Sequence, residues 1–66
     1  MRLKINGKQQ EIKDCFDLEK LISSKGLNPN NIVVEYNTKI IPKQNWPEVI
    51  LKPEDMIEIV SFVGGG

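Results

Sequence analysis

The residues best suited to chemistry stand at the C-terminal end of the 66-residue sequence, where Phe62-Val63 runs into three glycines. Because glycine has no Cβ, Gly64 and Gly65 have wide backbone freedom and the smallest cross-section a peptide can have. We therefore expect them to thread a partner's channel that is too narrow for side chains. The Gly66 carboxylate would then be open to attack, and an ATP-dependent partner could activate it as an acyl-adenylate with AMP as leaving group.

A glycine tail can also be a solvated end without a function. The tail here follows an apolar strand with only Val63 between Phe62 and the glycines, and it ends a chain with a β-grasp pattern. This context favours a tail that serves as a substrate. In that case the chemistry belongs to other proteins.

The composition excludes most side-chain chemistry. The sequence has no histidine and one cysteine, so zinc-finger ligand sets, intrachain disulfides and Ser-His-Asp or Cys-His catalysis are ruled out. A chain this short also has too small a core to enclose a large substrate pocket. We therefore predict no enzyme, no catalytic residue, no metal site and no bound cofactor.

Cys15 is the one thiol in the sequence, so it is the candidate for a side chain that transfers sulfur. Its neighbours Asp14 and Asp17 are acidic, and acidic neighbours disfavour the thiolate that such chemistry needs. We interpret Cys15 as structural or incidental.

Charge and hydropathy exclude two classes of partner. Nine Lys and Arg balance nine Asp and Glu, so no basic field attracts nucleic acid or anionic lipid. No apolar run is long enough for a membrane span or a signal peptide. We expect a cytoplasmic protein.

The N-terminal segment reads as a β-hairpin. Alternating apolar and charged residues predict strands near 1–5 and 8–13, and Asn6-Gly7 is a strong signal for a two-residue turn. With that turn, Arg2 should face Glu11 across the ladder.

Apolar residues then recur with the helical period of 3.6 residues, which predicts one helix over residues 17–25. Asp17 should cap its start and Gly26 should end it. Alternation returns in three further predicted strands, at 32–36, 39–41 and 56–63. Residues 43–50 should form a turn or short 3₁₀ segment in which Trp46 covers the core.

The order β-β-α-β-β-β predicts an α+β fold, a ubiquitin-like β-grasp with a mixed sheet of four to five strands and one main helix. We assign residues 1–63 to a single domain and 64–66 to a flexible glycine tail. Val33, Val60 and Phe62 should point away from the helix, where they could form a docking patch for partners.

The sequence resembles the thiamine-biosynthesis sulfur carrier family, the ThiS family, over essentially its whole length. The segments that carry the resemblance are Leu3-x-Ile5-Asn6-Gly7, Tyr36-Asn37-x-x-Ile40-Ile41-Pro42-Lys43 followed by Trp46, Asp55-x-Ile57-Glu58-Ile59-Val60, and Phe62-Val63-Gly64-Gly65-Gly66. One departure is Glu54, where the family pattern leads us to expect glycine before the aspartate.

The resemblance implies a mechanism. A ThiF-like adenylyltransferase would adenylate Gly66 with ATP, and sulfur from a cysteine desulfurase would displace AMP to leave a thiocarboxylate. A ThiG-like thiazole synthase would then receive the sulfur for the thiazole ring of thiamine.

Two other carriers share the tail chemistry. The small subunit of molybdopterin synthase is expected to be longer and to have a Pro-Pro pair before its diglycine, which Ser61-Phe62-Val63 lacks. A ubiquitin-like protein modifier would instead join Gly66 to lysines of target proteins.

Overall fold

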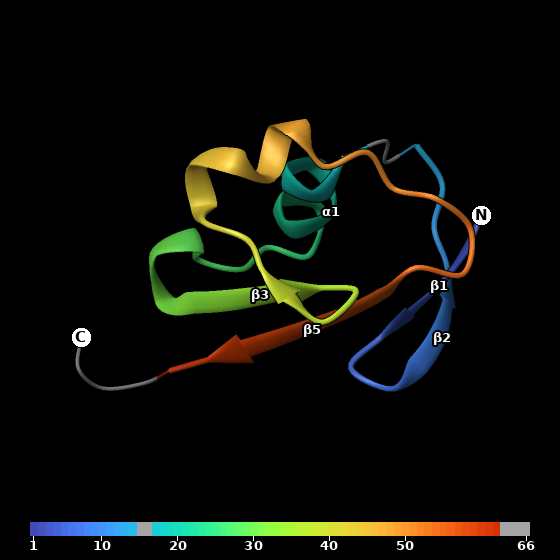
Figure 1. Cartoon of the computed structure of the whole chain (residues 1–66), viewed down its shortest axis with the longest axis horizontal. Helices are drawn as coiled ribbons and strands as arrows, with labels where there is room; N and C mark the ends of the chain where they lie inside the picture. Colours follow the sequence, from blue (N-terminus) through green and yellow to red (C-terminus); the bar gives the residue numbers. More distant parts are fainter. Residues whose placement is uncertain (15–16, 63–66) are drawn as a thin grey trace.

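A five-stranded mixed sheet carries one α-helix and two 3₁₀ segments on one of its faces in the computed structural model, which describes residues 1–14 and 17–62. The strand order is β2-β1-β5-β3-β4. In Figure 1, α1 and the 3₁₀ segment η2 both lie above the sheet. The predicted α+β class with a ubiquitin-like β-grasp is therefore confirmed.

The N-terminal hairpin consists of β1 (Arg2–Ile5) and β2 (Lys8–Glu11). Asn6 and Gly7 both have positive φ, at 51° and 81°, as a type I′ turn requires. Arg2 lies opposite Glu11, so the predicted register is confirmed. The second strand ends at Glu11, earlier than the predicted residue 13, although Ile12 still exchanges two hydrogen bonds with Met1, at 2.8 and 2.9 Å.

The helix α1 spans Leu18–Ser24. The Asp17 side chain accepts a hydrogen bond from the backbone N–H of Lys20 at 2.8 Å, which satisfies a free N–H of the first turn. Gly26 follows the C-cap Lys25 with φ of 70°. The predicted range of 17–25 differs from the observed helix only by the two cap residues.

The second half of the chain supplies β3 (Ile32–Tyr36), β4 (Lys39–Ile40) and β5 (Met56–Ser61). The 3₁₀ segments η1 (Pro29–Asn31) and η2 (Lys43–Glu48) precede β3 and follow β4. The first and last strands are parallel neighbours, with Ile5 beside Ile57. β5 ends at Ser61, and the last residue of the predicted strand, Val63, lies outside the described residues.

The core lies between the sheet and the layer formed by α1 and η2. Its buried members come from every layer: Leu3, Ile5, Leu18, Leu21, Ile22, Ile32, Val34, Trp46, Leu51 and Ile57. Trp46 is 2% exposed, and its indole N–H donates to the carbonyl of Ile41 at 2.9 Å. The predicted role of Trp46 as a cover of the core is confirmed.

The turn before β5 explains why glycine is expected at position 54. The N–H of Asp55 bonds to the carbonyl of Lys52 at 3.2 Å, and Glu54 has φ of 72°. A turn with Pro at its second position and positive φ at its third is type II, which favours glycine at the third. Glu54 therefore occupies a conformation that glycine adopts with less strain.

No helix in the described part of the chain is long and apolar enough to cross a membrane.

Candidate functional site

The segment that leads to the glycine tail is held in place up to its last described residue. The N–H of Phe62 donates to the carbonyl of Asn31 at 3.0 Å, which extends the pairing of β5 with β3 beyond Ser61. On the other edge of β5, the N–H of Ile59 donates to the Asn6 side-chain oxygen at 2.7 Å. The chain is therefore fixed in the middle of the sheet as far as Phe62.

Four residues of the sequence-based site hypotheses lie outside the described residues. They are Gly64, Gly65 and Gly66 of the tail, and Cys15 before the helix. Their predicted roles stay predictions.

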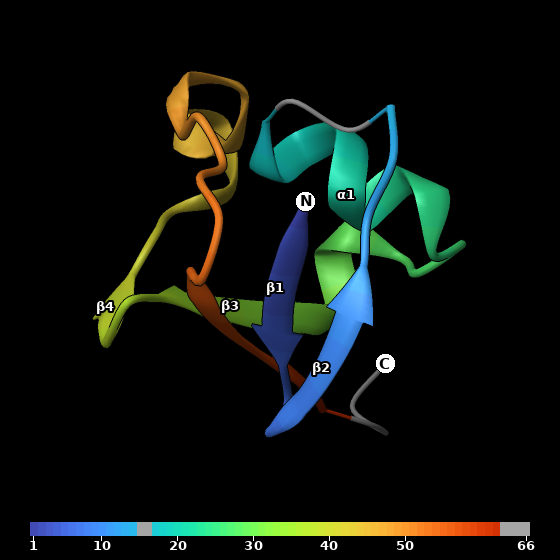
Figure 2. The same ribbon diagram turned by 90° about the vertical axis from the view of Figure 1, so that its right-hand side faces the viewer.

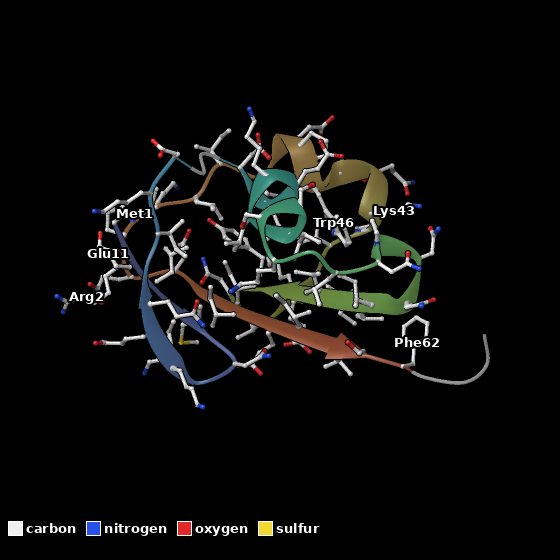
Figure 3. All side chains as sticks on the ribbon, turned by 180° about the vertical axis from the view of Figure 1, so that it is seen from behind. Met1, Arg2, Glu11, Lys43, Trp46 and Phe62 are labelled. Carbon is white, nitrogen blue, oxygen red and sulfur yellow. The ribbon has the colours of Figure 1, made fainter. Side chains whose placement is uncertain are left out.

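Three apolar side chains on or beside the central strands are exposed. Val33 on β3 lies directly opposite Val60 on β5, and the two are 36% and 58% exposed. Phe62 is 52% exposed and lies at the end of the molecule where β5 leads to the tail (Figure 3). The pairing thus places Val33 beside Val60, and Phe62 follows two residues later along the chain. Docking itself stays a prediction.

The alternation of β5 produces this arrangement. Ile57 is fully buried against the helical layer, whereas Glu58 and Val60 are exposed. In Figure 2, α1 and η2 lie above the sheet, and no described helix covers the other side. We call that side the bare face.

Two carboxylates on the bare face were missed by the sequence analysis. Glu35 on β3 lies directly opposite Glu58 on β5. Each residue alone looks like an ordinary solvated acid, and only the register of β3 with β5 brings the two together. That register depends on tertiary pairing, which no local pattern in the sequence specifies.

A buried carboxylate organises the opposite end of β5. Asp55 is 7% exposed and accepts hydrogen bonds from the Tyr36 hydroxyl at 2.6 Å, the Asn37 amide at 3.2 Å and the Lys52 N–H at 2.8 Å. Burial of Tyr36, together with its bond to Asp55, raises the pKa of this phenol to about 12. This cluster joins two turns at the start of β5, so we assign it a structural role.

The N-terminal corner carries an ion pair far from Phe62. The Met1 amine lies 2.9 Å from a Glu11 carboxylate oxygen, and its hydrogen bond and charge lower the pKa of Glu11. Figure 3 shows Met1 and Glu11 at the opposite end of the molecule from Phe62. The described residues contain no group of three or more side chains suited to hold a metal ion.

The fold and this site define a small β-grasp protein whose central strand runs along an exposed apolar face as far as the last described residue, Phe62. Comparison with known proteins makes the assignment specific. The ThiS family model matches residues 3–66. The sulfur carrier protein ThiS of Bacillus subtilis (strain 168) is 43% identical over 65 residues, covering 97% of this chain and 98% of that protein. The chain therefore belongs to the ThiS family, as the sequence predicted.

A solved structure agrees with this assignment. The crystal structure of the thiamine biosynthesis protein ThiS from Geobacter metallireducens matches with a TM-score of 0.85 and 25% identity, and the match covers 100% of both chains. Membership of a sulfur carrier family of thiamine biosynthesis is thus supported by sequence and by fold.

Longer relatives contain a matching segment as well. A thiazole synthase of Paramagnetospirillum magneticum is 35% identical over 66 residues, which is all of this chain but 20% of that protein. A thiazole synthase of Magnetococcus marinus is 32% identical over the same length, again 20% of its own sequence. The chain therefore spans about a fifth of the length of these two relatives.

Proposed function

We propose that this chain carries sulfur for thiazole formation in thiamine biosynthesis as a thiocarboxylate on Gly66. The observation that carries the proposal is the family match, which extends through the three glycines to residue 66. The anchoring of β5 supports it, because a strand fixed up to Phe62 presents whatever follows at a defined point of the surface.

The chemistry proceeds in two stages on the terminal carboxyl group. In the first, a carboxylate oxygen of Gly66 attacks the α-phosphorus of ATP, pyrophosphate leaves, and an acyl-adenylate forms. In the second, a persulfide sulfur attacks the acyl carbon; a C–S bond forms, the bond to AMP breaks, and AMP leaves with the electron pair. A thiol then reduces the resulting acyl disulfide, which releases the thiocarboxylate.

The chain supplies the acyl group in this scheme and its partners supply the catalysis. A ThiF-like adenylyltransferase would use ATP, and a cysteine desulfurase would provide the persulfide. We propose that these reactions take place in the cytoplasm and need no catalytic side chain or bound cofactor on this protein. Gly64 and Gly65 would lie in the narrow channel that leads to the adenylation site.

The acceptor of the sulfur is the best supported partner. Two thiazole synthases contain a segment similar to this whole chain within a longer polypeptide. Two activities joined in one polypeptide act at a high effective concentration of each other. We therefore propose a separate, ThiG-like thiazole synthase as the partner of this chain.

Intact mass spectrometry tests the proposal. The protein is incubated with the adenylyltransferase, ATP, a cysteine desulfurase, cysteine and a thiol, and the replacement of oxygen by sulfur should add about 16 Da. A variant that lacks Gly65 and Gly66 should keep its fold and gain no mass, because the tail contributes little to stability. Conjugates of much larger mass would favour a protein modifier, and an unchanged mass with active partners would refute the proposal.

The patch formed by Val33, Val60 and Phe62 is proposed as part of the docking surface for these enzymes. Phe62→Ala should weaken binding to the adenylyltransferase while the free energy of unfolding changes by less than about 1 kcal/mol, since the side chain is half exposed. Calorimetric titration and urea denaturation measure the two effects. A large loss of stability would instead place Phe62 in the core.

A further inference from the structure

Two like charges face each other in the middle of the bare face. Glu35 and Glu58 are directly opposite in the antiparallel pairing of β3 with β5. Side chains at directly opposite positions have Cβ atoms roughly 4.5–5.5 Å apart, and like charges there repel each other. Folding therefore brings together two carboxylates that would be farther apart in the unfolded chain.

Four of the positions that border this pair on the bare face are apolar. Val60 and Met56 flank Glu58 along β5, Val33 precedes Glu35 on its own face of β3, and Ile40 lies opposite Glu35 on β4. All four are exposed, at 58%, 45%, 36% and 65% for Val60, Met56, Val33 and Ile40. The pair is thus surrounded by side chains that a partner can cover.

Neither carboxylate has a cation of its own within residues 1–14 and 17–62. The salt bridge found in that part of the chain joins Met1 to Glu11. The nearest lysines by register are Lys4, which lies opposite Met56, and Lys39, which lies opposite Tyr36. Each acid instead has its counterpart acid across the ladder, and no cation of the described residues pairs with either one. The exposed Arg2 and Lys4, which alternate with the buried Leu3 and Ile5, lie on the β1 side of the bare face.

This charge arrangement selects among possible occupants. Two copies stacked with their Glu35–Glu58 pairs in contact would bring four carboxylates together, which is unfavourable without counter-ions. The pair would also repel a phosphate group placed at its position. A protein surface with a Lys or Arg surrounded by apolar side chains complements both the acids and the apolar border. Covering the border excludes water and strengthens the ion pairs.

We propose that Glu35 and Glu58 together receive one basic side chain of the thiazole synthase partner, with the surrounding apolar residues as the contact rim. This rests on the proposed function, which names that partner. The acid pair then fixes the orientation of the carrier in the complex, because the partner's basic group can bind at one position of the bare face. The apolar patch supplies contact area, and the two glutamates supply specificity.

The test is a binding measurement with thiazole synthase from the same organism as probe. Glu35→Gln and Glu58→Gln should each weaken binding by about tenfold, and the double variant should bind with a shallower dependence on salt than the original chain. Glu19→Gln, an exposed acid on α1 in the other layer, is the matched control and should bind as the original does. Both test variants should unfold at the same or higher urea concentration, since the repulsion is removed, so lost binding cannot result from lost folding.

Unchanged affinity and salt dependence in the double variant would overturn the inference. The result is separable from the proposed function, because sulfur loading at Gly66 is read from intact mass and does not require the thiazole synthase. A chain that loads sulfur but binds independently of the two glutamates contradicts this inference alone. A chain that never loads sulfur but loses binding in the variants contradicts the proposed function alone.

Discussion

The two faces of the sheet come from the same strands but have opposite roles. Neighbouring residues of β3 show the difference most simply, because Val34 is fully buried beneath the helical layer and Val33 is 36% exposed on the bare face. On β5, Ile57 is fully buried and Val60 is 58% exposed. The covered face holds the molecule together, whereas the bare face keeps apolar and acidic groups that folding does not use.

This difference follows from the size of the chain. One short helix and the 3₁₀ segments cover one face of the five-stranded sheet, and residues 1–14 and 17–62 contain no further helix for the other. Apolar residues on an uncovered face lower solubility unless a partner covers them. The covered face therefore provides stability, and we propose that the bare face provides recognition.

The largest expected effect comes from the same substitution made on the two faces. Val34→Ala should lower the free energy of unfolding by about 2–3 kcal/mol, because it removes buried methyl groups and leaves a cavity. Val33→Ala should lower it by less than about 1 kcal/mol, since its side chain is partly exposed. Urea denaturation of both variants measures the comparison.

The two substitutions should affect partner binding in the opposite order to their effect on stability. Val33→Ala should weaken binding to the thiazole synthase more than Val34→Ala does under conditions in which both are folded. Equal losses of stability in the two variants would contradict the assignment of separate roles to the faces.

A smaller loss of stability is expected at the start of β5, where a hydrogen bond joins Tyr36 of β3 to Asp55. Tyr36→Phe removes the donor that lies 2.6 Å from the Asp55 carboxylate and should cost about 1–2 kcal/mol. Asp55 would keep the Asn37 amide and the Lys52 N–H as donors, so the variant should still fold. Denaturation at neutral pH measures the loss.

The same tyrosine gives a pH dependence. Its pKa is raised from 10.0 to about 12 in the folded protein, so its contribution to stability is complete below pH 10 and is lost as pH rises through about 12. The stability difference between the original chain and Tyr36→Phe should therefore shrink over this interval. The sequence contains one tyrosine, so its ultraviolet absorbance follows the titration directly. Ionisation near pH 10 would show that the hydroxyl is not held by Asp55.

The smallest effect is expected at the turn that leads into β5. Glu54 has φ of 72°, a conformation that costs a residue with a side chain roughly 1 kcal/mol or more. Glu54→Gly should relieve this strain, but it also raises the entropy of the unfolded chain, so we expect a net stabilisation of less than about 1 kcal/mol. A lower urea midpoint for this variant would show that Glu54 stabilises the turn through its side chain.

Local patterns predicted most of the fold. The Asn6-Gly7 turn, the Asp17 cap and the alternation of residues 32–36 each act over a few positions, and all three are present in the structure. The ends of the elements were predicted less accurately than their existence. For example, β2 ends at Glu11 and not at the predicted residue 13. The exposure of Val60 and Phe62 could be predicted from alternation alone. Both are an odd number of positions from the buried Ile57, and side chains an odd number apart in a strand point to opposite faces.

The missed features depend on contacts between distant segments. Glu35 lies opposite Glu58 because β3 pairs with β5 in one register. Asp55 accepts a hydrogen bond from the Tyr36 hydroxyl, which comes from 19 residues away in the sequence. Each of these residues is unremarkable in its own local pattern. The match of the Tyr36-Asn37 and Asp55 segments to the family pattern was a signal that they interact, and their shared hydrogen bonds give its physical reason.

The central claim is that sulfur is carried on Gly66, and locating the added sulfur tests it most directly. After loading with the adenylyltransferase and the sulfur donor, the protein is digested and its peptides are fragmented in a mass spectrometer. We predict a gain of about 16 Da confined to the C-terminal peptide, with Cys15 unmodified. Sulfur found on Cys15 with an unchanged terminal carboxylate would contradict the account.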